Sequence, residues 1–194
     1  CPFCLSSDRE RLYMHYLSIF FKVRPEKYSI LDFAPSKAFS LAIRKFNFVT
    51  YTSADYYREG FDLKIDICNM DSVNSESYDI VICSHVLEHV SDPDEALAEI
   101  YRVLKSGGLA IIMVPLFWDV NETLENSHYD SDELRCRYFG QKDHLRLFAK
   151  DDFLRRVKEA NFRVESLDAS SFNAKEIRKF GISENSILYV CHRP

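Results

Sequence analysis

The sequence predicts an α/β domain in which helices cover both faces of a doubly wound, mostly parallel sheet of seven strands. Segments with strand-like and helix-like spacing of apolar residues alternate along the 194 residues. The central strand-like segments are nearly continuous apolar runs, as expected for strands buried on both faces. Alternating strands and helices of this kind pack as a parallel sheet covered by helices. The length suits one domain with a substantial core.

The elements expected in the N-terminal half follow from the spacing of apolar residues. Leu12, Tyr16 and Ile19 recur at helical intervals and predict a first helix. The run YDIVIC, residues 78–83, is expected to be a central strand. In chain order the expected elements are helix 9–22, strand 28–33, helix 36–46, strand 48–53, a short strand 61–67 and strand 78–83.

Strong boundary signals surround the next helix. Asp92 can cap it, Pro93 suits the first helical position, and Glu95 completes a capping box. Gly107 and Gly108 are expected to end this helix. The remaining expected elements are strand 109–114, helix 151–160, strand 162–167, helix 174–180 and strand 187–191.

Residues 116–143 have no clear period. The segment is polar, contains Trp118 and several other aromatic residues, and is too long for a simple connection. We therefore expect a lid or a substrate loop here.

Composition and charge exclude several function classes. Hydrophobic residues make up 46% and charged residues 28% of the chain, as in an ordinary globular protein. The net charge of −5 argues against a dedicated nucleic-acid binder. The longest apolar runs are of strand length, so no membrane association is expected. No secretory leader is visible, which makes a cytoplasmic location the expectation.

Basic residues are concentrated in one segment. Residues 135–163 hold nine lysines and arginines against four acidic residues. This pattern fits either a solvated helix face or a basic wall facing an anionic substrate.

The chain begins Cys1-Pro2-Phe3-Cys4, the spacing of two zinc ligands. A structural zinc site needs four ligands, and no second pair of this spacing follows. We therefore expect no metal site in this chain.

Polar residues follow the ends of several expected strands. They are the stretch Asp32 to Ser36, Asp55, Asp66, and Ser84 with His85. Ligands of doubly wound sheets bind beyond the carboxyl ends of the strands, and an acid after the second strand can accept both hydroxyls of a ribose. Each acid alone could equally form a turn or cap a helix. Together they indicate a nucleotide-like cofactor.

Residues 78–115, YDIVICSHVLEHVSDPDEALAEIYRVLKSGGLAIIMVP, resemble the fourth-strand to fifth-strand segment of class I S-adenosylmethionine-dependent methyltransferases. The resemblance covers about residues 28–115 and resumes at 139–165. The chain is also similar to a methyltransferase type 11-like subgroup with an F-A-P first loop and an N-terminal C-P-x-C. The matching positions in the first segment are Asp79, Leu87-Glu88-His89, Glu99, Arg102 to Lys105 and Gly107-Gly108.

The resemblance implies a Rossmann-like fold with an antiparallel last strand and S-adenosyl-L-methionine as cofactor. We expect an N-terminal C-x-x-C segment and helix over 1–27, where the helix either forms a lid over the donor or packs in the ordinary way. A donor-binding methyltransferase domain over 28–194, with the substrate loop 116–143, would follow. Asp55 would bind the ribose hydroxyls, Asp66 the adenine amino group and Ile67 the adenine. The methionine portion would lie against Cys83, Ser84 and His85, above the loop Phe33, Ala34, Pro35 and Ser36. The subgroup carries His and Glu where this chain has Asp32 and Ser36.

The first loop lacks the glycines that such loops usually carry. Glycine is needed where φ is positive or where a Cβ would meet the ligand. Pro35 favours an extended conformation at Ala34, so we expect the loop to turn without a left-handed residue. Ala34 is small enough for close approach, and Ser36 can cap the next helix. The donor carries no phosphate, so we expect a working loop.

Three histidines are candidate catalytic bases, because an oxygen or nitrogen acceptor must lose a proton and His titrates near neutrality. His85 follows the fourth strand, nearest the expected methyl group. His89 is one helical turn further and could equally be a surface residue. His144 and Arg146 suggest a base beside an anion clamp, and Trp118 is a further candidate for acceptor binding.

The expected function is methyl transfer from S-adenosylmethionine to a small-molecule or glycan-linked acceptor, at oxygen or nitrogen, and the basic segment is compatible with an anionic acceptor. A non-catalytic module that retains the fold and binds the donor is the alternative, favoured by the glycine-free loop. A nicotinamide dehydrogenase is disfavoured because G-x-G-x-x-G is absent.

Overall fold

The computed structural model describes residues 1, 3, 5–117 and 120–194. Its main sheet has seven strands in the order β3-β2-β1-β4-β5-β10-β9. Strand β10 runs antiparallel to both of its neighbours, β5 and β9, and the other pairs of this sheet are parallel. The predicted doubly wound sheet with an antiparallel last strand is therefore confirmed. The strands are β1 (Tyr28–Phe33), β2 (Val49–Asp55), β3 (Leu63–Lys64), β4 (Tyr78–Ser84), β5 (Leu104–Met113), β9 (Arg163–Leu167) and β10 (Leu188–His192).

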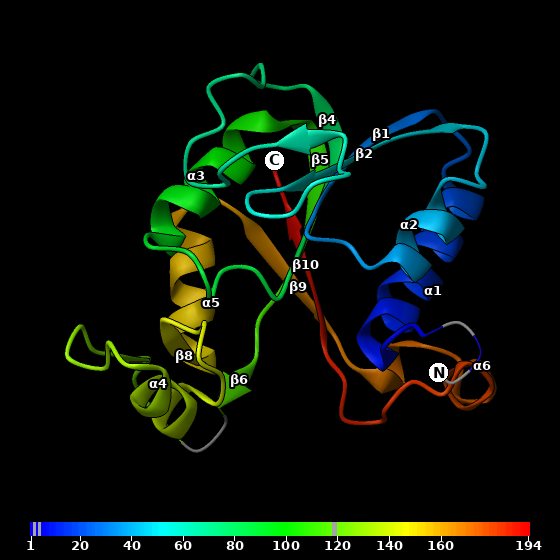
Figure 1. The fold of residues 1–194 in the computed structure, drawn as a ribbon. Coiled ribbons are helices and arrows are strands. Elements are labelled where there is room, and N and C mark those ends of the chain that lie inside the picture. Colours follow the sequence, from blue (N-terminus) through cyan, green and yellow to red (C-terminus); the bar gives the residue numbers. More distant parts are fainter. Residues whose placement is uncertain (2, 4, 118–119) are drawn as a thin grey trace.

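Helices cover both faces of this sheet. Figure 1 shows α3 and α5 on one side and α1, α2 and α6 on the other. None of the helices that the structure describes combines the length and apolar character needed to cross a membrane. The helices are α1 (Asp8–Val23), α2 (Lys37–Ile43), α3 (Pro93–Val103), α4 (Asp132–Phe139), α5 (Lys150–Glu159) and α6 (Ala174–Phe180), with a 3₁₀ turn at Ala169–Ser171.

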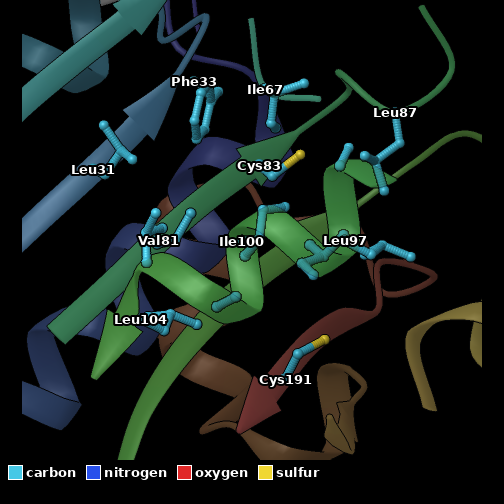
Figure 2. Packing of buried hydrophobic residues seen from close by; sticks show 14 of the residues in the cluster. Leu31, Phe33, Ile67, Val81, Cys83, Leu87, Leu97, Ile100, Leu104 and Cys191 are labelled. Carbon is cyan, nitrogen blue, oxygen red and sulfur yellow. The ribbon is translucent and has the colours of Figure 1, made fainter. Parts of the chain in front are cut away.

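The core has two layers because side chains alternate along each strand. On β4, Val81 and Cys83 belong to the layer beneath α3 and α5, which Figure 2 shows. Ile80 and Ile82 belong to the layer beneath α1, α2 and α6. All four side chains are fully buried, which explains why this segment is so apolar in sequence.

The end of α3 differs from the prediction. Asp92 caps the helix as expected, accepting from the backbone N–H groups of Asp94 and Glu95. The helix ends at Val103, before the two glycines, and these lie within β5. A Cβ on Gly108 would lie 2.8 Å from the carbonyl oxygen of Lys105. Gly108 therefore permits a close backbone approach and does not end the helix.

The segment 116–143 contains more regular structure than predicted. It includes β6 (Leu116–Phe117), β7 (Leu124–Glu125) and α4. The two strands flank β8 (Arg146–Ala149) in a small second sheet. Figure 1 shows β6, β8 and α4 together beside α5. The role of residues 116–143 as a substrate loop stays a prediction.

Candidate functional site

The carboxyl ends of β1, β2 and β4 lie side by side at one edge of the sheet. β1 is hydrogen-bonded to both other strands, and all three run parallel. The chain passes from β1 to β2 on one side and returns to β4 on the other, so this edge is the switch point at which such sheets bind ligands. Ala34, Asp55 and Ser84 all stand at strand ends here.

The first loop turns through a left-handed residue, so the expectation about its path was wrong. Ala34 has φ +50°, the region that favours glycine. Its N–H donates to the carbonyl of Ala54 at 2.8 Å, which ties the loop to β2. Ala34 is exposed, whereas Pro35 and Phe33 are buried. The conformation that Pro35 disfavours is therefore imposed by the surrounding sheet, and it presents the smallest side chain of the loop to solvent.

Ser36 follows this turn and begins α2. Its hydroxyl accepts from the backbone N–H of Phe39 at 3.2 Å, which confirms the predicted cap.

Asp32 lies directly beneath the same loop. Only 2% of the residue is exposed, and one carboxylate oxygen accepts a hydrogen bond from the Tyr51 hydroxyl at 2.7 Å. Burial raises the pKa of Asp32 to about 8, which the Tyr51 hydrogen bond partly offsets and nearby Glu10 reinforces. The carboxyl group is therefore mostly protonated at neutral pH.

Asp55 ends β2 and is already engaged with its own loop. Its Oδ1 accepts from the backbone N–H groups of Tyr57 and Arg58, and its Oδ2 accepts from the Arg58 guanidinium at 2.7 Å. Burial acts to raise the pKa of Asp55, but the contacts with Arg58 and Tyr57 outweigh it and hold the pKa below its usual range. The Arg58 side chain is 56% exposed, whereas the Asp55 side chain is 6% exposed.

The expected adenine and methionine contacts are placed as follows. Asp66 is half-buried and accepts from the Cys68 backbone N–H through Oδ1. Ile67 and Cys83 are core residues, 4% and 0% exposed. Contact between Cys83 and a ligand would therefore involve its main chain. The Ser84 hydroxyl is buried and has no hydrogen-bond partner among the residues that the structure describes.

His85 stands just past the end of β4 in a strained conformation. Its φ is +58°, and its N–H donates to the carbonyl of Met113 at 2.7 Å. Left-handed non-glycine residues cost about 1 kcal/mol or more and are concentrated at functional sites. Its Nδ1 lies 3.2 Å from Oε1 of Glu88.

The other two predicted histidines meet Glu88. The rings of His89 and His144 are in edge-to-face contact, with centroids 4.8 Å apart. Potential ligand atoms of Glu88, His89 and His144 all lie within 4.8 Å of one another. The structure therefore brings all three predicted histidines to one carboxylate.

Arg146 braces the loop that carries Glu88 and His89. It is 1% exposed, and its guanidinium donates to the carbonyls of Leu87, Val90 and Ser91 and to Glu125. These contacts occupy all five of its N–H groups. Binding of an acceptor by Arg146 stays a prediction. Trp118 lies outside the described residues.

Two cations of the basic segment, Arg155 and Arg156, form ion pairs with acids. Arg155 contacts Asp152 and Glu159, and Arg156 contacts Asp94 and Asp152. An anionic acceptor therefore stays a prediction.

An apolar groove lies between α1 and α2, away from these residues. Met14, Phe39, Ala42 and Phe46 are among its lining residues, and none of the predicted site residues is.

Glu88 is a member of the cluster with His89 and His144, and it was not among the candidate site residues. The segment that resembles methyltransferases includes it as part of Leu87-Glu88-His89. The available signal was an acid preceded and followed by histidines within five positions, His85-Val86-Leu87-Glu88-His89. The contribution of His144, 56 positions after Glu88, needed the fold.

The chain matches the model of the methyltransferase domain family over residues 5–167, and it belongs to that family. No curated protein matches the chain closely enough to count as a relative.

Solved structures share the fold at low sequence identity. The [4+2]-cyclase SpnF aligns with a TM-score of 0.66 and 14% identity, over 96% of this chain and 81% of that chain. A complex between the Haloferax volcanii Trm112 methyltransferase activator and a putative methyltransferase aligns with a TM-score of 0.57 and 17% identity, over 96% of this chain and 93% of that chain. A Burkholderia thailandensis 1,6-didemethyltoxoflavin-N1-methyltransferase was solved with bound 1,6-didemethyltoxoflavin and S-adenosylhomocysteine. It aligns with a TM-score of 0.58 and 13% identity, over 91% of this chain and 75% of that chain.

At these identities the structural likeness establishes the fold. Together with the family match, it confirms the expected class, an S-adenosylmethionine-dependent methyltransferase domain.

Proposed function

We propose that this protein transfers a methyl group from S-adenosylmethionine to an oxygen or nitrogen of a small-molecule or glycan-linked acceptor. The observation that carries the proposal is the meeting of Ala34, Asp55 and Ser84 at the switch point of a chain that belongs to the methyltransferase domain family. A small-molecule acceptor is the first choice, because the Burkholderia thailandensis neighbour was solved with a small molecule bound.

The residues at this edge fit the donor. Ala34 is exposed in a left-handed turn, and its small side chain suits a close approach of the donor. The Ser84 hydroxyl offers a hydrogen bond that none of the described residues uses. Asp55 offers a carboxylate to the ribose once the exposed Arg58 side chain moves away.

When bound, the donor supplies a methyl group on a sulfonium: the acceptor atom forms the new bond to that carbon, the S–C electron pair stays on sulfur, and the acceptor proton goes to a base. His85 is the residue that we assign as this base, because it directly follows β4. Its contact with Glu88 orients the ring. Alignment of the two reactants supplies much of the rate.

The non-catalytic alternative loses its main argument. It rested on a first loop without glycine, whereas Ala34 adopts the left-handed conformation for which glycine is usually needed.

Calorimetric titration with S-adenosylmethionine and S-adenosylhomocysteine tests the proposal. Asp55→Asn keeps an acceptor for the loop N–H groups but removes the charge, and it should weaken donor binding by tenfold or more, since hydrogen bonds to a charged group contribute about 1.5–3 kcal/mol. Arg58→Ala is the matched control and should bind the donor at least as well as the unmodified protein. The ribose assignment is wrong if the two variants lose affinity equally. Absence of binding to the unmodified protein would refute the function.

A further inference from the structure

We propose, against the expectation drawn from the cysteine spacing, that Glu88, His89 and His144 form a binding site for one divalent transition-metal ion, with Zn²⁺ the first choice. Glu88 and His89 come from the loop after β4, and His144 comes from the chain that enters β8. Two imidazole nitrogens and one carboxylate oxygen are a donor set that suits zinc and iron. Three protein ligands leave an open coordination position, as in catalytic zinc sites.

His89 and His144 each have an Nε2 lone pair available for a metal ion. His144 Nδ1 lies 2.9 Å from the carbonyl oxygen of Phe139, and His89 Nδ1 lies 3.1 Å from that of Asp143. A carbonyl oxygen can only accept, so each Nδ1 carries the hydrogen and each neutral ring has its lone pair on Nε2. Hydrogen bonds of this kind fix the tautomer of metal-binding histidines. His89 Nε2 faces Glu88 Oε1 at 4.0 Å.

Glu88 lacks the partners that a buried carboxylate requires. It is 1% exposed, and neither carboxylate oxygen has a hydrogen-bond donor among the described residues. A buried charge without compensation is strongly destabilising. His85 Nδ1 lies 3.2 Å from Oε1 of Glu88, without forming a hydrogen bond to it. A metal ion would compensate the carboxylate and occupy the Nε2 lone pairs together.

The loop that carries two of the ligands is held firmly. Arg146 donates to the carbonyls of Leu87 and Val90, which flank Glu88 and His89. The N–H of Leu145, next to His144, donates to the carbonyl of Glu88 at 2.8 Å. The strand that begins at Arg146 thus ties the third ligand to the first two, and such support is what an accurate site needs.

Small movements would complete the site. Ligand atoms about 2.1 Å from an ion stand roughly 3–3.5 Å apart, whereas the present spread reaches 4.8 Å. The side chain of His89 is 30% exposed, so its ring can move and an ion can enter from solvent.

An ion here would select the acceptor, and this part rests on the proposed function. The cluster adjoins Ser84 and His85, the expected place of the methyl group. The open position would take an oxygen of the acceptor, and a bound metal lowers the pKa of a coordinated hydroxyl toward neutrality. The acceptor class is therefore a hydroxyl compound, which favours O-methylation.

Zinc binding to chelator-treated protein, measured by calorimetry and by metal content after dialysis, tests the site. A background with Cys1→Ser and Cys4→Ser removes the other pair of candidate ligands. One ion per chain is expected, and Glu88→Gln and His144→Gln should each weaken binding more than tenfold, the lower range for loss of groups around a metal site. His128→Gln changes an exposed histidine outside the cluster and should bind as the background does.

His89→Gln guards against misfolding of the buried variants, because this residue is partly exposed. It should also weaken zinc binding. No zinc binding in the background with Cys1→Ser and Cys4→Ser, or equal binding by the cluster variants, refutes the site. Donor titration of the chelated protein separates the two proposals: normal donor binding without zinc binding leaves the proposed function standing, and the reverse result leaves only the metal site.

Discussion

Asp32 is expected to make the stability of this protein fall as pH rises toward 8, and Asp32→Asn should remove that dependence. The carboxyl group is 2% exposed, accepts one hydrogen bond from Tyr51, and forms no ion pair among the described residues. Burial raises the pKa of Asp32 to about 8 in the folded protein. In the unfolded chain the pKa is about 4.

The sign and size of this pH dependence follow from proton linkage at Asp32. Between about pH 4 and pH 8 the folded state holds a proton at Asp32 that the unfolded state has lost, so the contribution to the free energy of unfolding falls with pH. The contribution is complete below about pH 4 and is lost as pH rises through the folded pKa. The slope is at most about 1.4 kcal/mol per pH unit, which gives an upper bound of about 5 kcal/mol across the window.

Urea unfolding of both proteins at about pH 5 and about pH 8 measures the effect. Asp32→Asn should gain stability relative to the unmodified protein by several kcal/mol between these two conditions, because the amide has no proton to lose. Asp130→Asn, at an exposed position, is the control and should leave the pH dependence unchanged. Parallel stability curves for the unmodified protein and Asp32→Asn would refute the reasoning.

Two further substitutions test the first loop and the brace. Ala34→Gly should raise the free energy of unfolding by about 1 kcal/mol in urea denaturation, because it relieves the cost of a left-handed alanine. The control Ala38→Gly, within α2, should lower the free energy of unfolding by about 0.5–1 kcal/mol. A loss of stability in both variants would contradict the Ala34 conformation. Arg146→Lys keeps the charge but not the five-donor geometry, and it should cost about 3 kcal/mol and lower the melting temperature. An unchanged melting temperature would show that the brace contributes little.

Local pattern predicted most of the elements. β1 and α6 have the bounds that apolar spacing assigned, 28–33 and 174–180. The seven-strand sheet followed from the alternation of apolar strands and amphipathic helices. These features are encoded locally, because the period of the side chains and the caps depend on neighbours within a few residues.

Pairing between distant segments decided what the sequence missed. β6 and β7 have two residues each, too few to show a period, and they are strands because β8 lies between them. The left-handed Ala34 is likewise set by its hydrogen bond to β2, against the local preference that Pro35 imposes.

The candidate site divides in the same way. The sequence by itself predicted the proposed donor side, since Asp55 and Ser84 stand at the ends of strands and parallel strands end at one edge. Only the tertiary structure brought Glu88, His89 and His144 together. His144 reaches Glu88 because Arg146 binds carbonyls 55 to 59 positions earlier in the chain, and no local pattern encodes a contact made across that distance.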